Sequence, residues 1–358
     1  MDIHERILSK CLEGTRLSRD EGAALYACDL LSLGRVADEI RRRSCPAATA
    51  TFVVDRNISY TNACTVGCEF CAFHRGPQTP EAFTLSLDEI VQKVKELVAL
   101  GGTQVMIQGG INPGIELDYY LELVRVLHQQ FPQVHIHSFS VMEFDMISKR
   151  FGVPLPKVLR LFKDAGLNSV PGGGAEILVD RVRELISPNK VSAARWLEVM
   201  RMVHEAGLRS TATMVIAHLE TIEERIAHLT KLRGLQDETG GFRAFIPWTM
   251  TPTADFPLEA RSSPGGEDYL KTVAIARLML DNFEHVQSGW LTEGLKMGQL
   301  ALRFGCDDMG GTLLEDKVLE SAGVEIKTRR EDLIRLIREA GFIPAQRDTN
   351  YEILHVYN

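Results

Sequence analysis

The sequence lacks long apolar runs and an excess of basic charge, and each absence excludes a class of protein. No stretch of the 358 residues approaches the roughly 18 apolar residues of a membrane-spanning helix, and the amino terminus has no apolar signal core. We therefore expect a cytoplasmic protein without a membrane span. Lys and Arg number 40 against 48 Asp and Glu, and a net charge of -8 disfavours binding to nucleic acid.

The sequence also has too few cysteines, and too uneven a distribution of them, for a disulfide framework. There are seven, an odd number, and Cys64, Cys68 and Cys71 fall within eight positions. Such a cluster in a reducing compartment indicates metal or redox chemistry. Low-complexity segments and Pro/Ser linkers are missing as well, so nothing in the composition marks a boundary between two globular units.

Apolar periodicity alternates between strand and helix over most of the chain. This alternation predicts a parallel sheet covered by helices, and the number of strands favours a (β/α)8 barrel of the TIM type, in the α/β class. We assign residues 1–48 to an N-terminal helical extension and residues 49–358 to the barrel with its C-terminal helices. The predicted strands are 51–55 leading to 58–60, 104–108, 135–140, 169–171, 210–216 and 243–248, with weaker ones at 285–288 and 301–305. The predicted helices are 86–100, 117–130, 156–165, 179–186, 193–206, 222–239, 268–282 and 330–340.

Chemically distinctive residues follow these predicted strands. In a barrel the active site lies at the carboxyl ends of the strands, on the loops that follow them. In strand order, those loops carry Cys64, Cys68 and Cys71, then Gly109 and Gly110, then Glu143, then Glu176, and then His218 and Glu220. The sequence therefore predicts that these side chains meet around one site.

The spacing of the three cysteines is compatible with two kinds of metal site. Three thiolates can hold three irons of a 4Fe-4S cluster and leave the fourth iron open to another ligand. Cys64, Cys68 and Cys71 with His74 could instead make a tetrahedral zinc site, and the chain would then be a zinc-clipped barrel that acts as a binding protein. A loop at the mouth of a large barrel favours the iron-sulfur interpretation, because an open coordination position is useful there.

The CxxxCxxC arrangement, with Phe70 just before the last cysteine and after the first strand, resembles the radical S-adenosylmethionine superfamily. The resemblance implies that Cys64, Cys68 and Cys71 bind a 4Fe-4S cluster whose open iron is chelated by S-adenosyl-L-methionine. It also implies a 5′-deoxyadenosyl radical that abstracts hydrogen from a small-molecule substrate. A low-potential electron donor such as flavodoxin or ferredoxin is implied as a partner.

Further roles follow from position in that superfamily. Gln108, Gly109 and Gly110 resemble the glycine-rich segment that meets the methionyl group, although a tight strand-to-helix turn would use the same residues. Glu143 stands where the superfamily often has a group that binds the ribose hydroxyls. An acidic residue in the first turn of a helix is the simpler alternative.

Longer motifs resemble the menaquinone enzymes of the futalosine pathway. These motifs lie at 169–177, 209–214, 218–221, 235–242 and 244–248, while 246–248, 287–290 and 345–349 look most like the cyclase branch. The resemblance implies conversion of dehypoxanthine futalosine to its cyclic form, through abstraction of the sugar C4′ hydrogen and addition to the benzoate ring. Ala217 departs from the pattern, because the family usually has glycine at that position.

The resemblance leaves several residues as candidates around the substrate. The candidate catalytic residues are His218, Glu220 and Glu176. His218 could be the base for the ring proton, and it shares a face with Glu220; a satisfied structural histidine is the alternative. Glu176 could bind sugar hydroxyls. The candidate substrate-binding residues are Trp248 beside the ring, and Arg347 and Arg56 on the benzoate carboxylate, because a guanidinium pairs with a carboxylate in bidentate geometry.

Two other kinds of enzyme in the superfamily are alternatives. Aminofutalosine synthase shares most of the motifs and would form an adenosine-containing adduct in place of free 5′-deoxyadenosine. Chemistry of the biotin synthase kind needs a second iron-sulfur cluster, and the remaining cysteines, Cys11, Cys28, Cys45 and Cys306, show no grouped ligand spacing.

Overall fold

A curved parallel sheet forms the centre of the molecule. The computed structural model describes residues 3–45, 48–251, 265–325 and 328–358. Seven strands follow one another in chain order around the sheet, and each pairs in parallel with the next. They are β2 (Asp55–Ser59), β3 (Gln104–Gln108), β4 (His135–Ser138), β5 (Ser169–Val170), β6 (Arg209–Ile216), β7 (Phe242–Thr249) and β8 (His285–Val286).

A second, smaller sheet brings the edges of the first together. Its strand β1 (Thr49–Val53) runs almost directly into β2 and pairs with β9 (Asp308–Gly311). An isolated bridge joins Asp308 of β9 to Gln287, which follows β8. Strands β10 (Ile343–Arg347) and β11 (Ile353–Val356) extend this sheet outward from β1. These pairings confirm the predicted α/β barrel.

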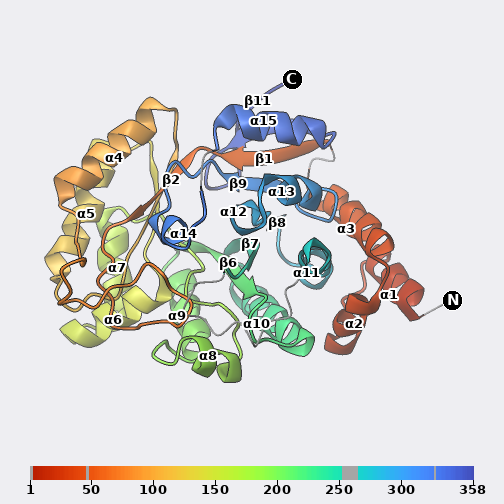
Figure 1. Ribbon diagram of the computed structural model, residues 1–358, viewed down its shortest axis with the longest axis horizontal. Helices are drawn as coiled ribbons and strands as arrows, with labels where there is room; N and C mark the ends of the chain where they lie inside the picture. The colour runs from red at the N-terminus through yellow and green to blue at the C-terminus, as the bar shows by residue number, and fades with distance from the viewer. Residues whose placement is uncertain (1–2, 46–47, 252–264, 326–327) are drawn as a thin grey trace.

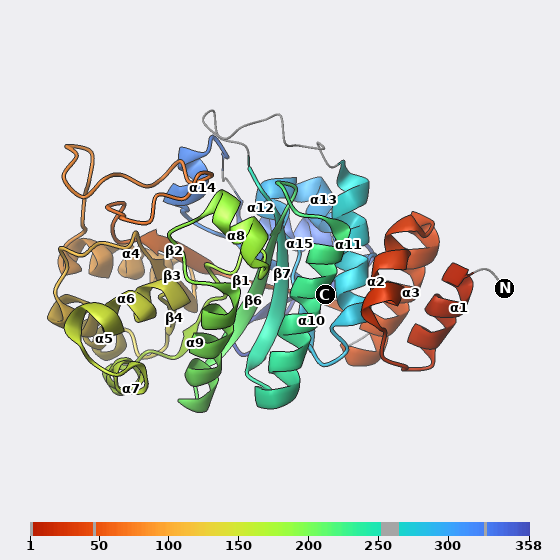
Figure 2. The same cartoon turned by 90° about the horizontal axis from the view of Figure 1, so that it is seen from below.

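Helices cover the outside of the barrel, as Figure 2 shows for its central part. Three of them begin with the reciprocal serine or threonine and glutamate pairs that satisfy a helix amino terminus: Ser86 with Glu89, Ser140 with Glu143, and Thr221 with Glu224. The helices between the strands are α4 (Leu87–Ala99), α5 (Leu117–Gln130), α6 (Val141–Phe151), α7 (Leu155–Ala165), α8 (Asp180–Ile186), α9 (Ala193–Glu205), α10 (Ile222–Thr239) and α11 (Gly266–Met279). After β8 come α12 (Trp290–Glu293), α13 (Leu295–Ala301), α14 (Lys317–Ser321) and α15 (Arg330–Glu339).

The first residues of the chain form helices beside the barrel. These are α1 (Ile3–Leu12), α2 (Arg19–Ala24), a short 3-10 turn (Leu25–Ala27) and α3 (Leu30–Ser44). Figures 1 and 2 place α1, α2 and α3 on one side of the molecule, and α3 packs against α11. The division of the chain at residue 48 stays a prediction. None of the helices in the described ranges is long and apolar enough to cross a membrane.

One predicted strand is wrong. Residues 301–305 form the end of α13 and the turn after it, and the eighth strand of the barrel is β9, a few residues later. Two of the four residues of β9 are glycines, so its sequence lacks the β-branched and aromatic side chains that are typical of strands. The glycines are required because space is short: a Cβ on Gly311 would collide with the Asp55 carboxylate, and Gly310 has a φ of +78°.

Candidate active site

The loop after β2 carries the three cysteines at one end of the barrel. In Figure 2 this loop is the orange segment, and it lies at the same end as α14. The Cys64 N–H donates to the Arg75 carbonyl at 2.8 Å, and the Cys71 N–H donates to the Cys68 carbonyl at 3.1 Å. Cys68 is buried and the other two cysteines are half-buried. The predicted position of the cysteine loop, at the carboxyl ends of the strands, is confirmed.

The spread of the thiols fits a cluster better than a single ion. Around one zinc ion with Zn–S bonds of about 2.3 Å, ligand atoms lie roughly 4 Å from one another. In the part of the chain that the structure describes, no three ligand atoms from Cys64, Cys68, Cys71 and His74 come within 4.8 Å of one another. His74 also uses Nδ1 to donate to the Cys71 carbonyl, at 2.7 Å. A 4Fe-4S cluster distributes its cysteines over separate irons, and these residues fit that arrangement.

A half-buried lysine lies beside the cysteine loop. Lys190 pairs with Glu176, and its ammonium lies 5.3 Å from the centre of the Phe70 ring. Burial raises the pKa of the Cys68 thiol to about 11, and the charge of Lys190 opposes that shift. Lys190 therefore favours negative charge on the loop. No motif points to this residue, which lies in a turn after α8.

The two glycines after β3 allow close approach to the cysteine loop. A Cβ on Gly109 would lie 2.6 Å from the Tyr60 ring, and one on Gly110 would lie 2.8 Å from the Cys64 Cβ and closer still to the Ala63 carbonyl. The Gly110 N–H donates to the Thr61 carbonyl at 2.9 Å. These glycines therefore position the loop whatever else they contact. A role in binding the methionyl group stays a prediction.

Glu143 is buried in the interior and does not line the cavity inside the barrel. Its carboxylate accepts from the Tyr60 hydroxyl at 2.8 Å and from the Ser140 N–H and Oγ at 2.7 Å. The residue is 0% exposed. The observed contacts are those of a helix cap, so binding of ribose hydroxyls would require Glu143 to exchange partners.

Replacing Glu143 by glutamine should change how stability depends on pH. Burial raises the pKa of Glu143 to about 7, whereas the unfolded value is about 4.3. Between these values the unfolded chain has lost a proton that the native carboxyl keeps, so the wild-type protein loses stability as the pH rises. Glutamine can keep the cap and does not titrate. From pH 5 to pH 7 the unfolding free energy of the wild type should therefore fall by roughly 2 to 3 kcal/mol relative to E143Q, measured with urea. If the difference in unfolding free energy between the two proteins were the same at pH 5 and at pH 7, the raised pKa of Glu143 would be contradicted.

A cavity of about 320 Å³ lies inside the barrel, below the cysteine loop. Residues of β2, β3, β6 and β7 line it, together with Phe70, Cys71 and residues of α14. Several buried polar atoms of its lining have no hydrogen-bond partner: Asn57 Oδ1, Arg243 Nε, Trp248 Nε1 and Thr349 Oγ1. Buried polar groups are normally paired, so these atoms, which themselves have almost no accessible surface, mark residues of the lining with unused hydrogen-bonding capacity.

The cavity brings together some of the predicted site residues and leaves others outside. Its lining includes Phe70, Cys71, Gln108, Glu176, Trp248 and Arg347. Trp248 lies at the end of β7, as expected for a residue beside the substrate. Glu176 adopts a φ of +41°, and its pKa is lowered by Lys190 and Arg183, which together outweigh its burial, so it is a carboxylate at neutral pH.

Arg56 lies outside the cavity, and we no longer expect it to bind substrate. Successive side chains of a strand point to opposite faces, and its neighbours Asp55 and Asn57 take the inward positions. Arg56 points outward and donates to Glu315 and Glu96, at 2.9 and 2.7 Å. The sequence could not reveal this, because the exact phase of a buried strand is set by its packing.

Arg347 lines the cavity but already has a counterion. Its Nε and Nη2 donate to the two oxygens of Asp308, at 2.5 and 2.9 Å. Its guanidinium also lies 3.9 Å from the centre of the Tyr351 ring. The predicted bidentate geometry is therefore present, but its partner is a carboxylate of this chain and not one of a ligand.

His218 and Glu220 belong to a closed network next to the cavity. The His218 Nε2 donates to the Val215 carbonyl at 2.9 Å, and Nδ1 accepts from the Leu219 N–H at 2.8 Å. Glu220 pairs with Arg225 and accepts from the His218 N–H. Burial lowers the pKa of His218, so the ring is neutral, and neither residue is among those that line the cavity. These contacts favour a positioning role for the pair.

Ala217 adopts a backbone conformation that suits glycine. Its φ is +72°, in the left-handed region that costs an alanine roughly 1 to 2 kcal/mol. We expect A217G to raise the unfolding free energy by about 0.5 kcal/mol, because relief of strain outweighs the added freedom of the unfolded chain. The matched variant A212G, in β6, should lose about 1 kcal/mol instead. Denaturant titration would contradict the account if both variants lost stability equally.

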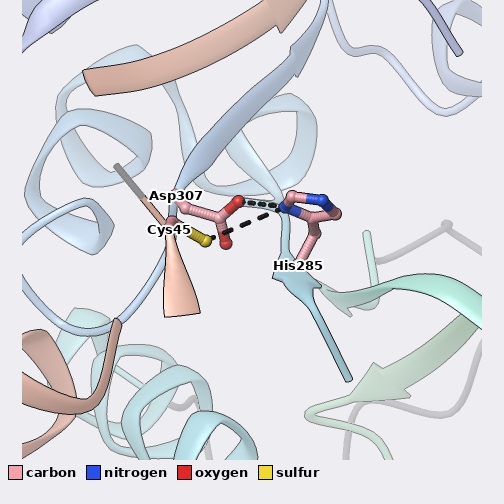
Figure 3. Close-up of side chains that lie close together, drawn as sticks. All are labelled: Cys45, His285 and Asp307. Carbon is pink, nitrogen blue, oxygen red and sulfur yellow. Dashed lines mark hydrogen bonds and ion pairs between the residues drawn. The ribbon is translucent and has the colours of Figure 1, made fainter. Parts of the chain in front are cut away.

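A second cluster of chemically active side chains lies away from the cavity. Ligand atoms of Cys45, His285 and Asp307 fall within 4.8 Å of one another, as Figure 3 shows. The Cys45 thiol and the Asp307 carboxylate both approach the same ring nitrogen, His285 Nδ1, at 3.9 and 2.6 Å. In a nucleophile–histidine–acid relay, by contrast, the nucleophile and the acid bind different nitrogens of the histidine ring. Asp307 also pairs with Arg277, and burial raises the pKa of the Cys45 thiol to about 12, so we assign the cluster a structural role.

Comparisons with known proteins agree with this geometry. The model of the radical SAM superfamily matches residues 58–232, and that of the CofH/MqnC C-terminal region matches residues 239–358. The cyclic dehypoxanthine futalosine synthase of Streptomyces coelicolor is 43% identical, over 98% of this chain and 89% of that protein. The aminodeoxyfutalosine synthase of Thermus thermophilus is 41% identical, over 98% of this chain and 96% of that protein. The crystal structure of methylornithine synthase superposes with a TM-score of 0.76 at 17% identity, over 95% of this chain and 97% of that one, and so shares the fold.

Proposed function

The chain belongs to the radical SAM superfamily, and from that premise we propose that it converts dehypoxanthine futalosine to cyclic dehypoxanthine futalosine in menaquinone biosynthesis. The observation that supports this reaction most directly is the 43% identity to a cyclic dehypoxanthine futalosine synthase over nearly the whole chain. The cavity inside the barrel, below the cysteine loop, is consistent with it, because radical chemistry needs a site that holds the substrate apart from bulk solvent.

The cofactors of the superfamily are a 4Fe-4S cluster and S-adenosyl-L-methionine, and Cys64, Cys68 and Cys71 are the residues that hold the cluster. When bound, these groups supply the 5′-deoxyadenosyl species that removes a hydrogen atom from the substrate. Lys190 stabilises negative charge on the loop, and the Phe70 ring, which lies against that lysine, lines the cavity. Gln108, from the end of β3, reaches the cavity and can orient a polar part of either ligand.

The reaction also needs a group that takes up the ring proton. Overall, the substrate loses one hydrogen atom to the 5′-deoxyadenosyl species, one proton to a base and one electron when the new ring closes and the arene becomes aromatic again. The acceptor of that electron would be the oxidised 4Fe-4S cluster, when bound. We propose Glu176 as the base, because it is a carboxylate and lines the cavity, whereas His218 and Glu220 are enclosed in their own network. A carboxylate within reach of the ring can act as a general base.

The variant E176Q should separate hydrogen abstraction from ring closure. Glutamine fills the same space but cannot accept the proton, so we expect cyclised product to fall by about 100-fold while 5′-deoxyadenosine still forms. Liquid chromatography with mass detection measures both compounds in one reaction. Because Glu176 pairs with Lys190, iron and sulfide content must match the parent protein. Product formation at the parent rate would remove Glu176 from this role.

The enzyme also requires an electron donor. We propose a low-potential carrier, flavodoxin or ferredoxin, and action in the cytoplasm, where thiols stay reduced. An anaerobic reaction with reconstituted protein, S-adenosyl-L-methionine, a reductant and dehypoxanthine futalosine tests the proposed function. A product lighter by two hydrogens, formed with 5′-deoxyadenosine, is expected. An adenosine-containing adduct from the synthase's substrate would instead indicate the activity named for the Thermus relative.

A further inference from the structure

Arg243 is a buried cation at the floor of the cavity. It lies near the start of β7, is 1% exposed and lines the cavity. Its guanidinium donates to the Ser169 hydroxyl at 2.9 Å, to Nδ1 of His137 at 3.3 Å and to Oδ1 of Asn350 at 3.2 Å. All three acceptors are neutral groups, and Nε of Arg243 has no partner.

No carboxylate among the described residues pairs with Arg243. This sets it apart from Arg347 and Arg277, whose charges are compensated by Asp308 and Asp307. Burial lowers the pKa of Arg243 to about 9, and the cations Arg209 and Arg347 act in the same direction. The charge of Asp348 opposes this shift from a distance, without an ion pair to Arg243. A buried charge without a counterion lowers the stability of the folded protein. The counterion that this site lacks is expected from a ligand.

We propose that Arg243 binds the benzoate carboxylate of the substrate at the floor of the cavity. The assignment rests on the proposed function, which supplies a substrate with that group. The unpaired Nε–H can donate one hydrogen bond to a carboxylate, and a second, parallel bond from Nη2 would replace its bond to Ser169 or His137. Arg347 cannot do this without giving up Asp308, and Arg56 faces away from the cavity.

The position of Arg243 along β7 also sets the direction of the substrate. Trp248 lies five residues further along the same strand, at the end nearer the cysteine loop, and both residues line the cavity. Five residues of strand span roughly 16 Å, enough for an extended molecule of this kind. The carboxylate at the floor therefore leaves the sugar at the mouth, where the hydrogen atom is removed.

Replacing Arg243 by glutamine tests the assignment on the protein side. Loss of one partner of a buried charge pair should raise the KM for dehypoxanthine futalosine on the order of 100-fold. Binding of S-adenosyl-L-methionine and iron content should stay at the parent level. The matched control is R209Q, which removes the same charge from an exposed neighbouring position and should leave KM unchanged. A parent-like KM in a folded, iron-loaded R243Q would overturn the assignment.

A substrate analogue tests the assignment without a variant. With a carboxamide in place of the benzoate carboxylate, the parent enzyme should bind on the order of 100-fold more weakly. R243Q should discriminate far less between the two compounds. If R243Q does not fold, the ratio of the parent enzyme's affinities for the two compounds is the test. Equal affinity of the parent for both compounds would overturn the role of Arg243 and leave the proposed function intact. Failure of the parent to bind or convert dehypoxanthine futalosine itself would overturn the proposed function, and the carboxylate site with it.

Discussion

Replacement of Cys68 by alanine is expected to abolish the cleavage of S-adenosyl-L-methionine. Cys68 is the buried cysteine of the three in the loop, and its thiol interacts electrostatically with Cys64, Cys71 and Lys190. Because loss even of groups that support metal ligands typically costs 10- to 100-fold, loss of a ligand should lower 5′-deoxyadenosine formation by more than about 100-fold. Iron and acid-labile sulfide should fall in parallel.

The control for this variant is Cys11→Ala. Cys11 is also a buried thiol, and burial raises its pKa to about 11 as well, but it lies in α1 beside the barrel. C11A should keep its cluster and its activity. A C68A protein with parent levels of iron, sulfide and deoxyadenosine formation would show that Cys68 does not hold a cluster.

Replacement of Gly110 by alanine should disturb the cysteine loop from its underside. The new Cβ would lie 2.8 Å from the Cys64 Cβ and still closer to the Ala63 carbonyl, so the backbone must move. Such overpacking typically costs 1 to 3 kcal/mol, and it displaces Cys64, which we propose as a residue that holds the cluster. We expect G110A to bind less than half of the parent's iron and to lose most deoxyadenosine formation.

Gly234→Ala is the matched control. Gly234 lies inside α10, and a Cβ there would meet nothing within 4 Å. Because alanine favours a helix by about 1 kcal/mol over glycine, G234A should be slightly more stable than the parent, with full activity. If G110A kept its iron and activity, the close approach of the two loops would have no functional consequence.

The barrel was predictable from sequence wherever a strand or helix carried a strong period. The segments 104–108, 117–130 and 222–239 match β3, α5 and α10 residue for residue. The prediction failed at β9, whose glycines are selected by the space beside Asp55 and not by strand propensity. It also missed α6, although the capping pair of Ser140 and Glu143 stands at its start.

The candidate site was only partly predictable. The cysteine spacing is a local signal, so the loop and its place in the barrel followed from the sequence. The counterions did not: Asp308 neutralises Arg347 and Glu315 binds Arg56, and both partners are distant in sequence. Arg243 and Lys190 were missed for the same reason, because a charge becomes significant only once its burial and its neighbours are known.

The most direct test of the account is the fate of one hydrogen atom. Dehypoxanthine futalosine carrying deuterium at the sugar C4′ position should be incubated anaerobically with the reconstituted enzyme, S-adenosyl-L-methionine and a reductant. The account predicts one deuterium in the 5′-deoxyadenosine and none at that carbon in a cyclised product. Unlabelled deoxyadenosine together with recovered, fully labelled substrate would contradict it.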